Sequence, residues 1–273
     1  MTSEGMAARA ALHFWEEPCI SGTEGSGAVF FSGCTLRCVF CQNHEIAAGA
    51  VGKPVTEERL SRIFLELQEK GANNINLVTA GHYAPAVAES LRRAKDMGLQ
   101  IPVVYNSSGY EKAEMLRYLE GLVDIYLPDL KYLEADLAGK YSHAKDYPEV
   151  AMKALEEMVR QVRTPEFDER GMMKKGVIVR HLLLPGCLAD GKRVVKYLHE
   201  TYGNRIYMSL MSQYTPLESL DAAKYPELNR KVPEYAYEKL VDYAISLGVM
   251  QAFIQEGDTA KESFIPPFTL EGV

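Results

Sequence analysis

The sequence predicts an α/β fold, in which a mainly parallel sheet forms a partial (β/α) barrel of about six core strands. Short apolar runs alternate with amphipathic helical segments six or seven times along the chain. Helix start and stop residues separate these segments at the intervals of βαβ units. With right-handed crossovers, the alternative architecture is an open doubly wound sheet. A length of 273 residues suits one large domain, so we expect a single domain over 1–273 with short terminal extensions.

The first βαβ unit shows the pattern most clearly. An apolar run at 28–32 predicts the first strand of the barrel. Thr56 is a suitable cap for the next helix, and Gly71 lies just past its end. Apolar side chains at positions 60, 63, 64 and 67 follow helical spacing, which predicts one buried face.

The later elements follow the same alternation. Pro148 and Pro233 are acceptable in first helical turns, and Gly248 follows the last helix. The β-branched run at 176–184 predicts a strand that is buried on both faces. The expected strands are 75–79, 101–105, 122–126, 176–184, 205–210 and 251–255, and the expected helices are 86–95, 111–119, 147–162, 190–202 and 233–247.

Composition and charge exclude several classes of protein. Apolar residues make up 47% of the chain and charged residues 25%, which is typical of a globular protein. The net charge of −7 argues against sequence-independent binding of nucleic acid. No apolar run approaches 18 residues, so no membrane span is expected. Residues 1–11 lack the pattern of a signal peptide, and we therefore expect a cytoplasmic location.

Three of the five cysteines lie within eight residues, directly after the first expected strand. Cys34, Cys38 and Cys41 have the spacing C-x3-C-x2-C, which indicates a metal site or a redox centre. Structural zinc takes four ligands, and His44 could complete a Cys3His set. A four-iron cluster held by three thiolates would instead keep one iron open to another ligand. An odd number of cysteines argues against a disulfide framework.

This cysteine loop, with the aromatic Phe40 just before the third cysteine, resembles the signature of the radical S-adenosylmethionine (SAM) superfamily. The nearest resemblance is to the branch of the pyruvate formate-lyase activating enzymes. It implies a barrel of the radical SAM type, a [4Fe-4S] cluster bound by the three cysteines, and S-adenosyl-L-methionine as second cofactor. It also implies an oxidoreductase whose reduced cluster cleaves SAM to a 5′-deoxyadenosyl radical. Reduced flavodoxin or ferredoxin is the electron donor that the resemblance suggests.

The resemblance also assigns SAM-binding segments at the ends of several strands. Thr79, Ala80 and Gly81 resemble a Gly-Gly-Glu motif that takes the methionine amino group, although its acidic residue is absent here. His82 follows instead, and its role is open, since Gly81 could simply allow a tight turn. The remaining residues that it implies for SAM binding are Phe40, Asn43, Asn106, Ser107, Ser108, Asp129, Lys131, Arg180 and Gln213.

Several of these residues also have purely structural interpretations. Asn106, Ser107 and Ser108 resemble a ribose-contacting segment, but a hydrogen-bonded turn would use the same residues. Alternation puts Asp129 and Lys131 on one side of an extended segment, where they could contact SAM or pair with each other.

The other candidates are equally open. Arg180 lies in an apolar run and must be paired, either with SAM or with a carboxylate of the barrel. Phe40 could equally pack the cysteine loop. Gln213 stands where activating enzymes have a histidine, and His181 and Cys187 could be simple core residues.

The substrate is not encoded in these motifs. An activase would abstract hydrogen from a backbone glycine of a glycyl-radical protein. The absent acidic residue and the changed Gln213 segment leave a radical enzyme acting on a small molecule or another peptide as the alternative. A non-catalytic metal-binding α/β protein is the second alternative.

Overall fold

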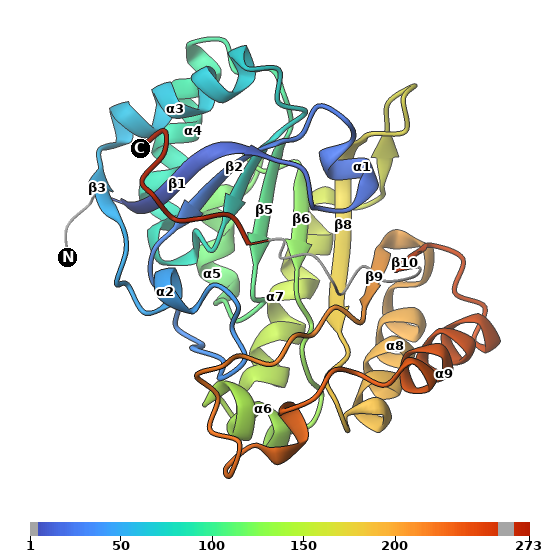
Figure 1. The fold of residues 1–273 in the computed structure, drawn as a ribbon. Coiled ribbons are helices and arrows are strands. Elements are labelled where there is room, and N and C mark those ends of the chain that lie inside the picture. Colours follow the sequence, from blue (N-terminus) through green and yellow to red (C-terminus); the bar gives the residue numbers. More distant parts are fainter. Residues whose placement is uncertain (1–4, 256–264) are drawn as a thin grey trace.

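The computed structural model describes residues 5–255 and 265–273 as one continuous sheet with helices packed on it (Figure 1). Within this part of the chain the strand order is β10-β9-β8-β6-β5-β4-β2-β1-β3, and β7 (Glu166–Phe167) pairs with β8. Seven strands from β2 to β10 are parallel and adjacent in chain order. This arrangement is an open, partial barrel, as the sequence predicts. The expected domain also includes 1–4 and 256–264, which lie outside the described residues.

The carboxyl ends of the parallel strands lie side by side along one edge of the sheet. Their bounds are β2 (Ser26–Phe31), β4 (Ile75–Val78), β5 (Val103–Ser107), β6 (Ile125–Pro128), β8 (Met173–Leu182), β9 (Tyr207–Met211) and β10 (Ala252–Ile254). Because all seven run in the same direction, the loops that follow them meet at one rim. The cysteine loop follows β2 and therefore lies on this rim.

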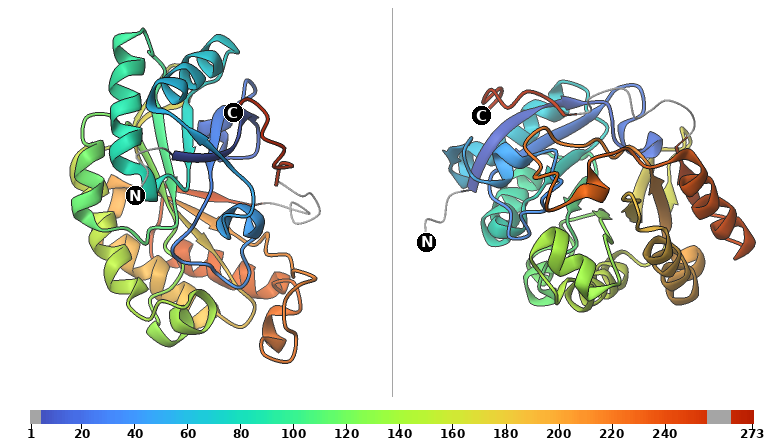
Figure 2. Two further views of the ribbon diagram at one scale, coloured as in Figure 1. Left: turned by 90° about the vertical axis from the view of Figure 1, so that its left-hand side faces the viewer. Right: turned by 60° about the horizontal axis from the view of Figure 1, so that its bottom comes forward.

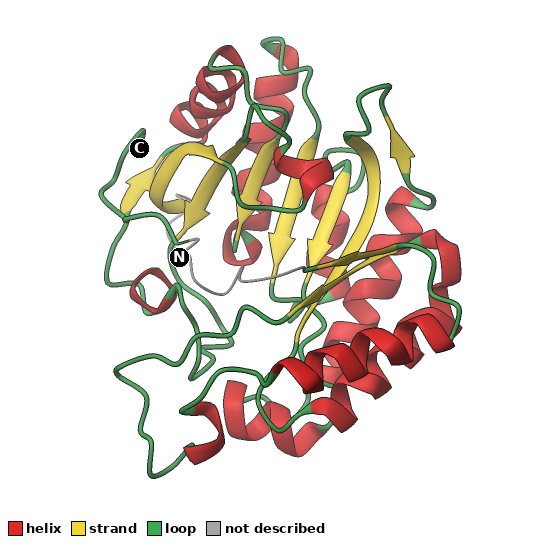
Figure 3. Ribbon diagram, turned by 45° about the vertical axis from the view of Figure 1, so that its right-hand side comes forward, coloured by secondary structure: helices red, strands yellow, loops and turns green. Residues whose placement is uncertain are grey.

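The longer helices cover one face of the sheet and leave the other face to the rim loops and the terminal segments (Figures 2 and 3). The helices are α1 (Pro18–Ser21), α2 (His44–Ala47), α3 (Glu57–Glu69), α4 (Ala84–Asp96), α5 (Ala113–Leu116), α6 (Ala135–Ser142), α7 (Tyr147–Val162), α8 (Leu188–Tyr202) and α9 (Glu234–Ser246), with short 3-10 turns at Gly81–Tyr83, Arg117–Leu119, Gly203–Arg205 and Pro226–Leu228. The Thr56 side chain caps α3 by accepting from the Arg59 backbone N–H at 3.2 Å, as predicted. None of the helices in the described part of the chain has the combined length and apolar character of a membrane span.

An antiparallel pair extends the sheet beyond β2. The strand β1 (Gly5–His13) pairs with β2, and the short β3 (Lys53–Val55) pairs with the start of β1. The C-terminal segment 265–273 runs beside β1, where the Ala10 N–H donates to the Glu271 carbonyl at 2.8 Å and the Leu270 N–H to that of Ala8 at 3.1 Å (Figure 1). The alanine-rich β1 was not expected, because small side chains carry little strand signal.

Three predicted strands were placed too early in the chain, and one of them is the strand expected at 205–210, which is β9 at 207–211. The strand expected at 101–105 is β5 at 103–107, and that expected at 122–126 is β6 at 125–128. Leu122 and Val123 are apolar, but their N–H groups bond to the Leu119 carbonyl and so complete the preceding turn. The expected helix at 111–119 is correspondingly shorter, with α5 at 113–116 followed by one 3-10 turn.

The interior of the barrel is apolar at its amino end. Cys19 and Ile20 of α1 pack there with side chains from the first part of several strands, which include Val104, Ile125 and Ile178. This apolar cluster fills much of the barrel floor, where the buried Asn74 amide also donates to the Ile20 carbonyl of α1 at 2.7 Å. The cysteine loop lies at the opposite, carboxyl end of the strands.

Candidate active site

The cysteine loop is fixed to the rim by backbone hydrogen bonds at both ends. The N–H groups of Gly33 and Cys34 donate to the carbonyls of Ile46 and Ala47 in α2, at 2.8 and 3.1 Å. Farther along, the Val39 N–H donates to a carbonyl of α6 at 2.9 Å. These bonds satisfy the backbone of an irregular loop and hold its side chains in place.

All three thiols of this loop line one cavity of about 270 Å³. The Ser142 hydroxyl lies 3.0 Å from the Cys38 sulfur and donates to it, and Tyr132 contacts Ser142 in turn at 3.0 Å. Burial raises the pKa of Cys41 to about 12 and also raises that of Cys38. As free thiols both side chains are therefore protonated, and a bound metal is what would make them thiolates.

The donor set fits an iron–sulfur cluster better than a single metal ion. In the part of the chain that the structure describes, no three Cys, His, Asp or Glu side chains are grouped closely enough for one ion. Thiolates of a four-iron cluster bind separate irons and stand apart. The zinc alternative required His44, which is exposed and does not line the cavity. Cys19 and Cys187 are buried away from it, so the described cysteines supply three ligands.

The segment after β4 has a strained backbone. Thr79 has φ +62°, which is rare for a β-branched residue, and its N–H donates to the Asn106 carbonyl at 2.9 Å. Thr79 lines the thiol cavity, whereas Ala80 is fully buried and lines neither this cavity nor its neighbour. Gly81 and His82 line a neighbouring cavity of about 260 Å³. The structure thus places Thr79 in the cavity of all three thiols and Gly81 in the neighbouring cavity, which Cys34 also lines, whereas Ala80 lines neither.

Asp129, Lys131 and Arg180 form one ion-pair network that lines the thiol cavity. The Lys131 ammonium lies 2.6 Å from Asp129 Oδ2, and Arg180 Nε lies 3.0 Å from Asp129 Oδ1. Burial alone would raise the pKa of Asp129, but the two cations hold it below its usual range. The expected alternation of Asp129 and Lys131 is confirmed, and so is the pairing of Arg180 with a carboxylate.

Two further contacts complete the surroundings of Arg180. Its guanidinium donates to Asn106 Oδ1 at 2.6 Å and to Glu16 Oε2 at 3.2 Å. Glu16 also accepts from the side-chain amides of Asn76 and Asn106, at 3.0 and 3.1 Å. Sequence reasoning missed Glu16, which comes from the loop after β1. Its buried carboxylate balances the charge that Arg180 brings into the barrel.

Tyr147, the first residue of α7, joins the loops that follow β5 and β6. Its hydroxyl accepts from the Lys131 N–H at 2.9 Å and shares its hydrogen between the carbonyls of Ser108 and Asp129, each at 2.9 Å. The sequence suggested only a helix start at this position. The hydroxyl fixes the spacing of two segments that were predicted to contact SAM.

The other predicted residues divide between the cavity and the core. Phe40, Asn43, Asn106, Ser107, Ser108 and Gln213 line the thiol cavity. Phe40 also packs edge-on against Tyr214, with ring centroids 6.4 Å apart. His181 is buried, with Nδ1 2.8 Å from the Leu130 carbonyl, and the buried Cys187 lies next to the start of α8. Both therefore fit the core interpretation.

An open α/β barrel with three thiols at its carboxyl rim and a polar, charged cavity beside them fits an iron–sulfur protein. The family model of the radical SAM superfamily matches residues 28–186, which is over half of the chain. The chain belongs to this superfamily. Its cofactors are accordingly a [4Fe-4S] cluster and S-adenosyl-L-methionine, and its chemistry is SAM-dependent radical chemistry.

Other proteins resemble this chain in sequence or in fold. An uncharacterized protein of Methanocaldococcus jannaschii is 28% identical over 241 residues, which are 85% of this chain and 65% of that protein. Methylornithine synthase has a similar structure, with a TM-score of 0.57, 12% identity, and coverage of 90% of this chain and 65% of that chain. Streptococcus suis SuiB bound to S-adenosylmethionine has a TM-score of 0.56 at 13% identity, over 82% of this chain and 48% of that one. The chain thus spans 48–65% of these relatives, and the structural likeness shows the fold.

Proposed function

We propose that this radical SAM enzyme is an activase, which abstracts hydrogen from a backbone glycine of a partner glycyl-radical protein. The proposal rests on the likeness of Asp129, Lys131 and Arg180 to the corresponding motifs of the activating enzymes. The observation that supports it best is that these three side chains form one network beside the three thiols. Cys34, Cys38 and Cys41 are the proposed ligands of three irons.

When both cofactors are bound, the reduced cluster supplies an electron that cleaves SAM to methionine and a 5′-deoxyadenosyl radical. The residues of the chain bind and orient. Lys131, with its ammonium at the cavity wall, is the proposed partner of the methionine carboxylate, because Asp129 alone does not use all three of its hydrogens. Asp129, which is itself held by Arg180, keeps the lysine in position. The ion pairs also prevent a buried charge from remaining without a partner.

The remaining predicted residues are assigned to the other parts of SAM. Ser107, Ser108 and Asn106 offer hydroxyl and amide groups for the ribose. Phe40 and Asn43, which flank Cys41, are proposed to contact the adenine. Thr79 and Gly81 are proposed to take the amino group through backbone carbonyls, whereas Ala80, also expected there, is buried and lines neither cavity. Gln213 is proposed to contact SAM from the loop after β9.

A radical enzyme that acts on a small molecule or another peptide is the second candidate. Gln213 stands in place of the histidine of the activating enzymes, and its carbonyl accepts from the Gln255 amide at 2.9 Å. Two paired amides suit a neutral polar substrate. One structurally similar protein, SuiB of Streptococcus suis, was solved with its precursor peptide SuiA, which favours a peptide among these alternatives.

Anaerobic reconstitution with iron and sulfide tests the cofactor site. The Cys34→Ala, Cys38→Ala and Cys41→Ala proteins should lose the cluster, whereas Cys187→Ala should keep it. The Lys131→Met protein should keep its iron but form 5′-deoxyadenosine more slowly. Full iron content in a Cys34, Cys38 or Cys41 variant contradicts the assignment. A loaded wild-type protein that never cleaves SAM favours a non-catalytic metal-binding protein.

Co-expression with candidate glycyl-radical proteins tests the substrate. The electron paramagnetic resonance doublet of a glycyl radical, dependent on Cys38, supports the activase. Turnover of a metabolite or another peptide without a doublet in any partner supports the second candidate. Electron transfer from flavodoxin or ferredoxin, a cytoplasmic location and a single domain over 1–273 stay predictions.

A further inference from the structure

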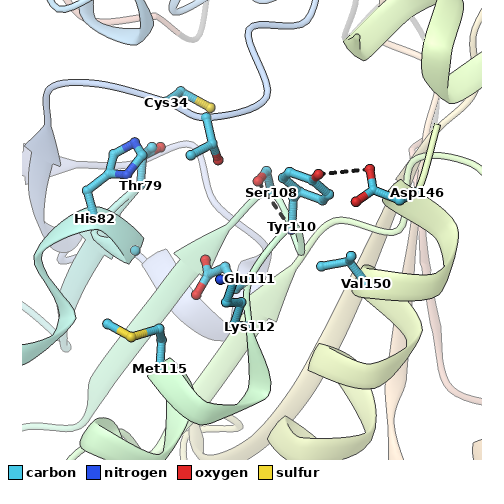
Figure 4. Close-up of a pocket in the computed structure, with 12 residues that line it drawn as sticks. Cys34, Thr79, His82, Ser108, Tyr110, Glu111, Lys112, Met115, Asp146 and Val150 are labelled. Atoms are coloured by element: carbon cyan, nitrogen blue, oxygen red, sulfur yellow. Dashed lines mark hydrogen bonds between the residues drawn. The ribbon is translucent and has the colours of Figure 1, made fainter. Parts of the chain in front are cut away.

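A second cavity adjoins the thiol cavity and shares Cys34, Thr79 and Ser108 with it. The loops after β4 and β5 form most of its wall, and Figure 4 shows Cys34 on one side and Glu111 on the opposite side. The segment after β4 is the one that lacks the acidic residue of its motif. Glu111, two residues beyond Gly109 on the neighbouring loop, brings a carboxyl group to the same place.

Packing holds this carboxyl directly over Gly81. A β-carbon on Gly81 would lie 3.2 Å from Glu111 Oε1 and 3.3 Å from the Tyr105 hydroxyl oxygen. Glu111 Oε2 accepts from the Tyr105 hydroxyl at 2.5 Å. The side chain is therefore fixed by a buried tyrosine, and the glycine of the β4 motif is what makes room for it.

No ion pair of the described residues neutralises this carboxylate. Lys112 lines the same cavity but forms no ion pair with Glu111, and Asp146 accepts from Tyr110 at 2.8 Å. Burial raises the pKa of Glu111 to about 7, although hydrogen bonds with Tyr105 and Ser107 act in the opposite direction. A desolvated carboxylate without a cation is costly, so a ligand that brings a cation would be bound favourably.

We propose that Glu111 binds the α-ammonium group of SAM and so replaces, from the loop after β5, the acidic residue missing after β4. This inference rests on the proposed SAM site and adds a binding residue to it. It explains why Cys34 and Thr79 line both cavities, because the ammonium group must lie near the cluster and near the β4 segment at once. Gly81 then serves to admit the carboxyl.

Binding measurements on the loaded but unreduced protein test this contact without turnover. Equilibrium dialysis would compare SAM with an analogue in which hydrogen replaces the α-amino group. Glu111→Gln should weaken SAM binding about tenfold or more, because one charge-assisted contact is lost. The same variant should bind the analogue as tightly as the wild type does. Glu114→Gln, which changes an exposed neighbour on α5, is the matched control and should leave both affinities unchanged.

Each outcome separates this contact from the wider proposal. Wild-type affinity of the Glu111→Gln protein for SAM overturns the role of Glu111, and so does an equal loss for SAM and the analogue. If the wild type still cleaves SAM in either case, the proposed function stands. A fully loaded wild type that does not bind SAM overturns both. Should Glu111→Gln not load iron, Glu111→Asp withdraws the carboxyl by one methylene and should show the same selective loss.

Discussion

The α-carbon of Gly109 lies against the carbonyl oxygen of Asp129, so closely that a β-carbon on Gly109 would overlap this oxygen. Gly109 also has φ +75°, a backbone conformation that residues other than glycine adopt only with strain. The contact joins the loop after β5 to the loop after β6, and both carry residues proposed to bind SAM. The spacing of the site therefore depends on a position without a side chain.

Replacing Gly109 by alanine should destabilise the protein by about 2–4 kcal/mol, since backbone strain and steric overlap add. Gly121→Ala is the matched control, because Gly121 has φ +74° and nothing within 4 Å of the added carbon. It should cost about 1 kcal/mol. Urea unfolding of the two variants checks the difference, and equal losses would show that the overlap is relieved by loop movement.

Tyr147→Phe should lower the free energy of unfolding by about 1–3 kcal/mol and also weaken SAM binding. The variant leaves the Lys131 N–H and two carbonyls without their partner. Tyr110→Phe is the control, because Tyr110 stacks on Tyr147 but its hydroxyl bonds to Asp146 at the surface. Calorimetric titration with SAM and urea unfolding measure the two effects. A Tyr147→Phe protein with unaltered SAM affinity would limit Tyr147 to a stabilising role.

Ser142→Ala should lower the reduction potential of the cluster. The Ser142 hydroxyl donates to the Cys38 sulfur, and hydrogen bonds to cluster sulfur favour the reduced, more negative state. A loss of about 1 kcal/mol of hydrogen-bond stabilisation of the reduced cluster corresponds to a decrease of about 40 mV in its one-electron reduction potential. Ser90→Ala, a buried serine that bonds within α4, is the control. Potentiometric titration measures the shift, and an unchanged or higher potential would contradict this contact.

Glu111 should make stability depend on pH between about 4.5 and 7. The folded pKa of about 7 exceeds the ordinary value of 4.5, so the folded protein holds a proton that the unfolded chain has lost. The stability that this proton supports is complete below pH 4.5 and is lost as the pH rises through 7. Relative to the wild type, Glu111→Gln should thus gain up to about 3 kcal/mol between pH 4.5 and 8. Urea unfolding over this range measures the gain, and a difference independent of pH would exclude the raised pKa.

The alternation of strands and helices was enough to predict the parallel sheet and the position of the cysteine loop. Apolar periodicity indicates which segments are buried, and in this fold the buried parallel strands lie next to one another in the order of the chain. The start of β6 was misplaced because Leu122 and Val123 are as apolar as strand residues. Only their hydrogen bonds to Leu119 distinguish a turn from a strand.

The predicted site was found where motif residues lie next to strand ends, as with Asp129 and Lys131. It was incomplete where the partner is distant in sequence. Ser142 contacts Cys38 across 104 positions, and Glu16 contacts Arg180 across 164. Serine and glutamate are common on any surface, so nothing local marks these two residues as part of a site.

The hydrogen bonds that join Ala8 and Ala10 to residues 270 and 271 have a consequence for how the protein is made. Residues 8–10 are synthesised early, but the residues that pair with their outward N–H and carbonyl groups are synthesised some 260 positions later. During synthesis this edge of the sheet is a bare template for another strand. Nascent or C-terminally truncated chains should therefore be the aggregation-prone species, and production in cells should benefit from a chaperone that covers this edge.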